Sequence, residues 1–406
     1  MQIFREHLLQ CRGRDKLLAS FPSLRRITSN GTYLAEIDGL RFVAIFAVMV
    51  FHIARLAQIH MGHSPLPQNP MGAFAFNIVM HGWYSVPLFF AISGFILGIP
   101  FAKHYLTGGK KVGLKAYLMR RVTRLEPPYI ASLLIRTAPV MAAKKMSFMM
   151  ILPHLVASLF YVHLIVFREL PVVQQVAWSL EIEVQFYLLV FFIAPLLFLG
   201  NTILRRLVFG ILLVAPGVAQ HYLFKDSFLL QHCILNWFQF FLAGMFVSDL
   251  SLTDFRRIPS SWLWDVLSAV LWLTFFSVSD YGSRVFGPPM LVLLFVGAFK
   301  GKVFKWFYST PPIAIIGGMC YSLYLTHSLV LQGAAWAFYK VASHGAYYPR
   351  YVLSEVAILP VLIVFGTIFF VLLERPCMDK QWPHNLMAFL RAKPSVPLEL
   401  QAQGDA

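Results

Sequence analysis

Ionisable residues inside apolar stretches are the first candidates for chemistry in this chain. The stretch at about 38–58 contains Asp38, Arg41 and His52. Arg41 and His52 are eleven residues apart, about three helical turns, so a helix projects both from one face, about 16 Å apart. Asp38 lies one turn before Arg41 and can pair with it. Because such residues usually face a cavity, we predict an anion site at Arg41 and a general base at His52. The structural alternative is a helix-start ion pair and an interhelical hydrogen bond from His52.

Three arginines precede two prolines in the segment from Leu114 to Pro128. They are Arg120, Arg121 and Arg124, and Arg120 and Arg124 are i,i+4 neighbours on a helix. Guanidinium groups match phosphate geometry because they offer planar pairs of donors. The cluster therefore predicts a phosphate site, with a simple basic membrane-stop signal as the alternative.

Further polar candidates lie in or beside other apolar stretches. Glu181 and Glu183 are two residues apart, so on a helix they point about 200° away from each other and only one can face a cavity. We favour Glu183. Tyr324 and His327 add a hydroxyl and a second buried imidazole, and Ser93 adds a small polar group that also permits close helix contact.

The composition indicates that the helices carrying these residues lie in a lipid bilayer. Of the 406 residues, 58% are hydrophobic and 13% charged, which excludes an ordinary soluble enzyme. Apolar segments long enough to span a bilayer predict an all-α membrane protein, a bundle of about ten transmembrane helices, with nine or eleven also possible. The ten segments are about 38–58, 83–101, 127–143, 184–200, 207–224, 229–248, 262–279, 287–299, 312–337 and 352–373.

The net charge of +16 follows the predicted topology and gives no reason to expect a nucleic acid partner. With ten spans, 24 Lys and Arg residues fall on one side and seven on the other, which predicts that both termini are cytoplasmic. We therefore expect a cytoplasmic basic segment at 1–37, a transmembrane domain at 38–376 and a cytoplasmic tail at 377–406. No cleaved signal peptide is expected, and the four scattered cysteines are expected to be free thiols.

Taken together, the motifs resemble a known family. IDGLR, the histidine eleven residues after its arginine, PLFFAISGFIL, RRVTRLEPPY, WSLEIEVQFYLL, YSLYLTHSLV and ERP occur in order over about 38–376. This series resembles the integral membrane acyltransferase family 3. The resemblance implies a ten-helix enzyme that takes an acyl group, commonly acetyl from cytoplasmic acetyl-CoA, to a hydroxyl of a carbohydrate, often a bacterial surface polysaccharide.

The resemblance also implies roles for residues. It makes Arg41 and His52 a catalytic pair, with Glu183 orienting His52 or binding the acceptor. Arg120, Arg121 and Arg124 become the binding site for the phosphates of CoA. Asp38, Ser93, Tyr324 and His327 are expected to contact substrate.

The sequence departs from the family pattern at Val184, where many relatives have a second acidic residue, so Glu183 is carried over and Glu181 is not. Relatives that act on peptidoglycan have a fused extracellular domain, and we expect none here because only 33 residues follow Leu373.

The sequence therefore predicts an O-acyltransferase in the bacterial inner membrane, with acyl-CoA, a carbohydrate acceptor and membrane lipid as partners and no metal. Antibiotics and signalling oligosaccharides remain possible acceptors. The alternative is a carbohydrate or lipid transporter in which the buried Asp, Arg and His residues relay ions and protons. Transporters often have repeated halves with broken spans in corresponding positions, and no such pairing is visible in the sequence. A structural or regulatory membrane protein ranks third.

Overall fold

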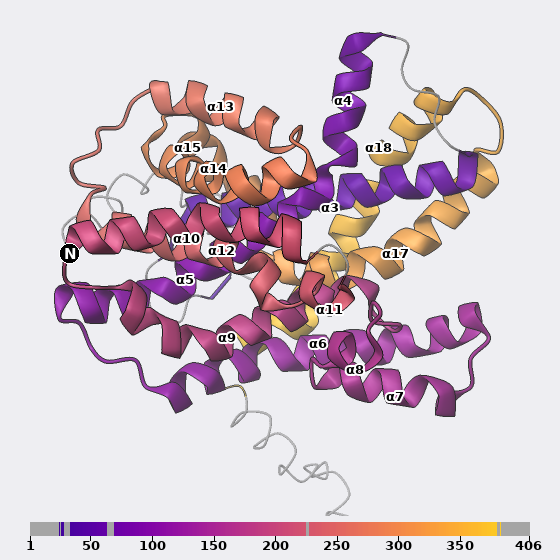
Figure 1. The fold of residues 1–406 in the computed structure, drawn as a ribbon. Helices are drawn as coiled ribbons and strands as arrows, with labels where there is room; N and C mark the ends of the chain where they lie inside the picture. Colours follow the sequence, from indigo (N-terminus) through magenta and orange to yellow (C-terminus); the bar gives the residue numbers. More distant parts are fainter. Residues whose placement is uncertain are drawn as a thin grey trace, which may run out of the picture.

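A computed structural model describes residues 24, 26–27, 33–62, 69–224, 227–379 and 382. All regular structure in these residues is helical, as expected for an all-α membrane protein (Figure 1). The elements are α3 (Ala35–Met61), α4 (Pro70–Met80), η1 (Gly82–Tyr84), α5 (Ser85–Thr107), α6 (Leu114–Lys144), α7 (Phe148–Leu159), α8 (His163–Phe167), η2 (Gln175–Ala177), α9 (Trp178–Leu197), α10 (Thr202–Leu223), α11 (Phe228–Gln231), α12 (Ile234–Thr253), α13 (Leu263–Phe275), α14 (Asp280–Lys300), α15 (Val303–Tyr308), α16 (Pro311–Gly318), α17 (Cys320–Val341), α18 (Tyr347–Phe369), η3 (Phe370–Glu374) and α19 (Arg375–Cys377).

Seven helical stretches in the described residues are long and apolar enough to cross a membrane. An eighth arises if α16 and α17, which meet at a bend of 72°, are counted as one broken span. The seven stretches are Ala35–Met61, Gly82–Thr107, Gln175–Leu197, Thr202–Leu223, Phe228–Thr253, Asp280–Lys300 and Tyr347–Cys377.

The predicted count of about ten spans is not confirmed, and two segments account for the difference from eight. The expected span at 262–279 forms α13, whose 13 residues reach only about 20 Å, short of a hydrocarbon core about 30 Å thick. The expected span at 127–143 is the second half of α6, a 31-residue helix that carries the three arginines in its first half. By contrast, the expected span at 287–299 extends to the full 21 residues of α14.

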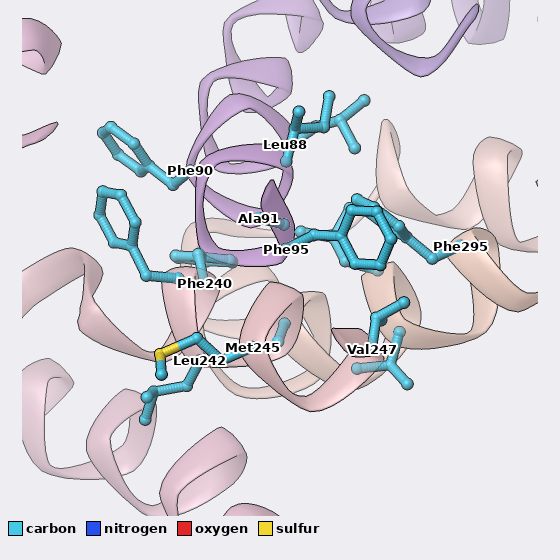
Figure 2. Packing of buried hydrophobic residues seen from close by; sticks show 14 of the residues in the cluster. Leu88, Phe90, Ala91, Phe95, Phe240, Leu242, Met245, Val247 and Phe295 are labelled. Atoms are coloured by element: carbon cyan, nitrogen blue, oxygen red, sulfur yellow. The ribbon is translucent and has the colours of Figure 1, made fainter. Parts of the chain in front are cut away.

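The centre of the bundle is the contact between α5 and α12. A Cβ atom on Gly94 would overlap the carbonyl oxygen of Phe241, and one on Gly244 would overlap that of Ala91, so glycine lets the two backbones touch. Around this contact, apolar side chains of α5, α12 and α14 interdigitate, among them Phe95 (Figure 2). This core fixes α5 against the rest of the bundle.

Helix α3 packs against α5, α16, α17 and α18. Gly317 of α16 sits so close to α3 that a Cβ there would overlap the carbonyl oxygen of Asp38. The bend at Met319 then starts α17 at Cys320, beside the first turns of α3. The broken span thus brings α17 toward the predicted anion site at Arg41.

Helices α7 and α8 follow α6 and lie beside it at one edge of the protein (Figure 1). Most of the predicted cytoplasmic segments 1–37 and 377–406 lies outside the described residues. Of the four cysteines, Cys233, Cys320 and Cys377 are free, as expected, and Cys11 lies outside the described residues.

Candidate active site

The first turn of α3 carries a buried charge cluster. Asp38 is 2% exposed, and its Oδ1 accepts hydrogen bonds from Arg41, as the spacing predicted, and from Nη1 of Arg26 at 3.1 Å. Burial, followed by repulsion from Arg41, lowers the pKa of Arg26. One carboxylate therefore holds two guanidinium groups beside the same cavity.

That cavity, here called the arginine cavity, has a volume of about 140 Å³. Arg26, Arg41, Arg121 and Arg124 line it together with Glu183 and Glu374. In Arg26, Arg121 and Arg124, the buried Nε atom has no hydrogen-bond partner. Buried donors are almost always paired in native structures, so three unpaired guanidinium nitrogens in one group of cavity-lining residues make this cavity a candidate anion site.

Only two of the three arginines of α6 lie where the sequence prediction put them. Arg121 and Arg124 line the arginine cavity, whereas Arg120 is exposed and does not. Burial and the nearby Arg26 lower the pKa of Arg124 to about 9, so its guanidinium remains charged at neutral pH and gains from an anion. Of the three arginines predicted to bind phosphate, only Arg121 and Arg124 line this cavity, which they share with Arg26 and Arg41.

Of the two candidate acids, Glu183, which the sequence analysis favoured, lines the arginine cavity, and Glu181 does not. Oε1 of Glu183 accepts a hydrogen bond from the Ser93 hydroxyl on α5. Glu181 points away toward α8, where its Oε2 accepts the backbone N–H of Leu164 at 3.0 Å. Glu183 thus lies among the arginines, and it does not line the cavity that contains His52.

His52 lines a second cavity of about 390 Å³, here called the histidine chamber. Its walls include Phe51, Trp83 and Trp178 and the polar groups of Gln175 and Ser179. This volume lies in the range of small-molecule sites, and mostly apolar walls with few polar groups are typical of them.

The arginine cavity and the histidine chamber adjoin. Phe89, Ser179 and Tyr324 line both. The Tyr324 hydroxyl donates to the carbonyl oxygen of Val176 and lies 3.0 Å from Oγ of Ser179. Tyr324 therefore stands at the boundary between the two cavities, held by η2 and α9.

His327 is the imidazole neighbour of His52, with ring centroids 5.3 Å apart. It is fully buried, and its Nδ1 donates toward the carbonyl oxygens of Leu323 at 3.1 Å and Tyr324 at 2.9 Å. Those carbonyls place the proton on Nδ1 and leave a lone pair on Nε2, which has no partner. His327 is thus fixed in one tautomer next to His52.

Two charged residues of the arginine cavity had no role in the sequence prediction. Arg26 precedes Asp38 by twelve residues in a segment without periodicity, and no sequence signal linked the two. Glu374 belongs to the ERP motif, which supported the resemblance without suggesting a role. It is buried, and its Oε2 accepts from the backbone and hydroxyl of Ser322 at 3.0 and 2.6 Å.

The fold and these cavities define a class: a helical membrane protein with an arginine-lined cavity next to a chamber that contains histidine. A family model described as an acyltransferase domain matches residues 34–375. The chain belongs to this acyltransferase family, which confirms the resemblance seen in the sequence.

Curated relatives carry related names. The protein named O-acetyltransferase OatA from Staphylococcus aureus (strain NCTC 8325 / PS 47) is 26% identical over 335 residues, covering 73% of this chain and 50% of its own length. The protein named "Putative O-acetyltransferase SACOL0978" from Staphylococcus aureus (strain COL) is 23% identical over 331 residues, covering 74% of this chain and 51% of its own length. The chain thus spans about half the length of these relatives. No solved structure matches.

Proposed function

We propose that this protein is a membrane-embedded O-acyltransferase that moves an acetyl group from acetyl-CoA to a carbohydrate hydroxyl. The observation that carries the proposal is the shared boundary of the two cavities at Phe89, Ser179 and Tyr324. It puts arginines with unpaired donors directly beside a histidine chamber whose volume suits a small substrate.

The donor end is the arginine cavity. Three unpaired Nε donors, on Arg26, Arg121 and Arg124, suit the phosphate oxygens of CoA. A volume of about 140 Å³ lies below the roughly 300–1,000 Å³ that is usual for small-molecule sites, so the cavity takes a small part of CoA and not the whole molecule. We infer that it holds phosphate, with the pantetheine arm directed toward Tyr324.

The reaction itself needs a base for the acceptor hydroxyl. His52 removes the hydroxyl proton as the oxygen attacks the thioester carbonyl, a C–O bond forms, the C–S bond breaks, and CoA leaves as a thiolate that takes up a proton. A transient acyl group on His52 is the other route. His327 lies beside His52, where its Nε2 lone pair can accept a hydrogen bond from a protonated His52.

The acceptor end is the histidine chamber, whose aromatic walls and few polar groups suit a sugar unit. The names of the relatives, as O-acetyltransferases, favour acetyl as the group transferred. The basic N-terminal segment, with Arg5, Arg12, Arg14, Lys16, Arg25 and Arg26 before the first apolar span, favours a cytoplasmic N-terminus and a cytoplasmic donor in a bacterial inner membrane. A surface polysaccharide is the acceptor that fits this orientation.

Thioester cleavage tests the proposal. Purified protein in lipid nanodiscs receives acetyl-CoA and candidate glycans, and free CoA thiol is measured. We expect acceptor-dependent release that His52→Ala abolishes and that His60→Ala, an exposed histidine near the end of the same helix, preserves. Movement of glycan across liposomes without CoA release would instead support the transporter. Comparison of surface glycan masses between a deletion strain and its parent then identifies the acyl group.

A further inference from the structure

Two histidines and a glutamate meet at the edge formed by α7 and α8. His154 lies on α7, His163 begins α8, and Glu169 follows α8. Nδ1 of His154 is 2.9 Å from Nε2 of His163 and 3.8 Å from Oε1 of Glu169. The three atoms lie within 4.8 Å of one another. None of these residues belongs to the arginine cavity or the histidine chamber.

The ligand set and spacing fit a metal ion. Two imidazoles and one carboxylate are a known set for Zn²⁺, and Zn–N distances of about 2.0–2.1 Å in a tetrahedron put two ligand nitrogens about 3.3 Å apart. The two imidazole nitrogens, 2.9 Å apart, need to separate by only a few tenths of an ångström. Glu169 is 54% exposed, so its side chain is free to move closer.

The surroundings are those of a half-closed site. His163 is fully buried and His154 is 16% exposed, and the ring of Phe167 packs 4.8 and 4.2 Å from their respective centroids. The alternative without a metal is a hydrogen bond between the imidazoles and an ion pair between His154 and Glu169, and zinc binding distinguishes the two. Nδ1 of His163 has no partner under either arrangement, so it favours neither.

We propose that His154, His163 and Glu169 bind one divalent transition-metal ion, of which Zn²⁺ fits best, with water in the fourth position. Imidazole ligands favour zinc over magnesium or calcium, which prefer oxygen. No step of the proposed acyl transfer uses this site, so the inference stands independently of that function.

The position suggests what the metal does. Glu169 directly precedes Leu170, which lines the histidine chamber, and the same segment supplies Gln175 and Val176 to that chamber. A metal held by α7, α8 and Glu169 would fix the position of the segment that begins at Leu170 and lines the histidine chamber. The ion therefore has a structural role and positions one side of the chamber.

Metal binding to the full-length protein tests the inference directly. Protein in nanodiscs is stripped with a chelator, given Zn²⁺, washed, and its zinc counted by mass spectrometry, while a zinc indicator dye measures affinity by competition. We expect one zinc per wild-type chain and at least about tenfold weaker binding by His154→Ala. The matched control is His344→Ala, an exposed histidine elsewhere, which should bind like wild type.

A second variant protects the test against misfolding. Glu169→Gln changes one exposed side chain, and it should also weaken zinc binding and abolish the rise in thermal unfolding midpoint that zinc gives the wild type. The inference is overturned if wild type retains no more zinc than His154→Ala, or if His154→Ala and Glu169→Gln both bind zinc as tightly as wild type.

Discussion

Replacing one half-buried arginine of the arginine cavity, and separately its exposed neighbour, distinguishes a phosphate site from a general basic surface. In Arg124→Gln, a guanidinium that lines the arginine cavity, and whose Nε has no partner, becomes a neutral amide. Arg120→Gln makes the same chemical change one turn earlier on α6, at an exposed position outside the cavity. The two variants share a helix, a residue type and a change in net charge.

The size of the effect follows from the contact that is lost. A hydrogen bond to a charged group contributes about 1.5–3 kcal/mol, and about 1.4 kcal/mol corresponds to a factor of ten in binding. Arg124→Gln should therefore weaken donor binding roughly 10- to 100-fold. Folding should survive, because Glu374, the nearby carboxylate, keeps its hydrogen bonds to Ser322 and a second cation, Arg26, nearby.

The assay is CoA release at varied acetyl-CoA concentration. Arg124→Gln should raise KM with little change in kcat, because a phosphate contact distant from the reacting carbonyl binds substrate and transition state alike. Arg120→Gln should resemble wild type. The pKa of Arg124, about 9, adds a pH dependence, because the guanidinium loses its charge as pH rises through this value. Wild-type donor binding should therefore weaken above about pH 9. The Arg124→Gln variant should show less of this weakening.

Equal effects of the two substitutions would refute the reasoning. That result would mean that donor binding depends on the overall positive charge of α6 and not on a cavity that selects two of its three arginines. A larger effect of Arg120→Gln would place the phosphate site on the exposed face of the helix.

Three further outcomes follow from the structure. His52→Ala should lower kcat about 10²- to 10⁴-fold, the usual loss with a general base, and His60→Ala should not; the measurement is CoA release at saturating substrates. Gly244→Ala should destabilise the bundle by about 1–3 kcal/mol because its methyl group meets a backbone carbonyl of α5, whereas Gly210→Ala, with open space at its Cβ, should be neutral or stabilising in thermal unfolding. Asp249→Ala should cost about 3–5 kcal/mol, since it leaves the buried arginine that it pairs with on α10 uncompensated; unchanged unfolding would contradict that role.

The apolar segments of the sequence predicted the positions of the helices well. They predicted the number of helices that cross the membrane less well. The sequence located α3, α5, α10 and α12 closely, because each carries enough apolar residues to span a bilayer. It overestimated the span at 262–279, where the helix ends at Phe275. Hydropathy averaged over a window does not report where a helix ends, and the bend of 72° between α16 and α17 has no periodicity signal at all.

Helical spacing correctly predicted which side chains of one helix can pair with each other. It was less successful in predicting which side chains of a helix face a cavity. The Asp38–Arg41 ion pair and the opposed directions of Glu181 and Glu183 follow from 3.6 residues per turn alone. The same rule grouped Arg120 with Arg124, yet the packing of α6 turned Arg120 outward.

By itself, the sequence determined that the protein lies in a membrane, that it is all-helical and which family it belongs to. These properties depend on composition and on motifs that are continuous in the chain. Only the tertiary structure decided which guanidiniums share a cavity, that Arg26 joins them, and that Tyr324 separates that cavity from His52. The reason is physical: a cavity belongs to the space between helices, and its lining depends on how far each helix is rotated and where backbones touch at glycine. No single helix encodes that rotation.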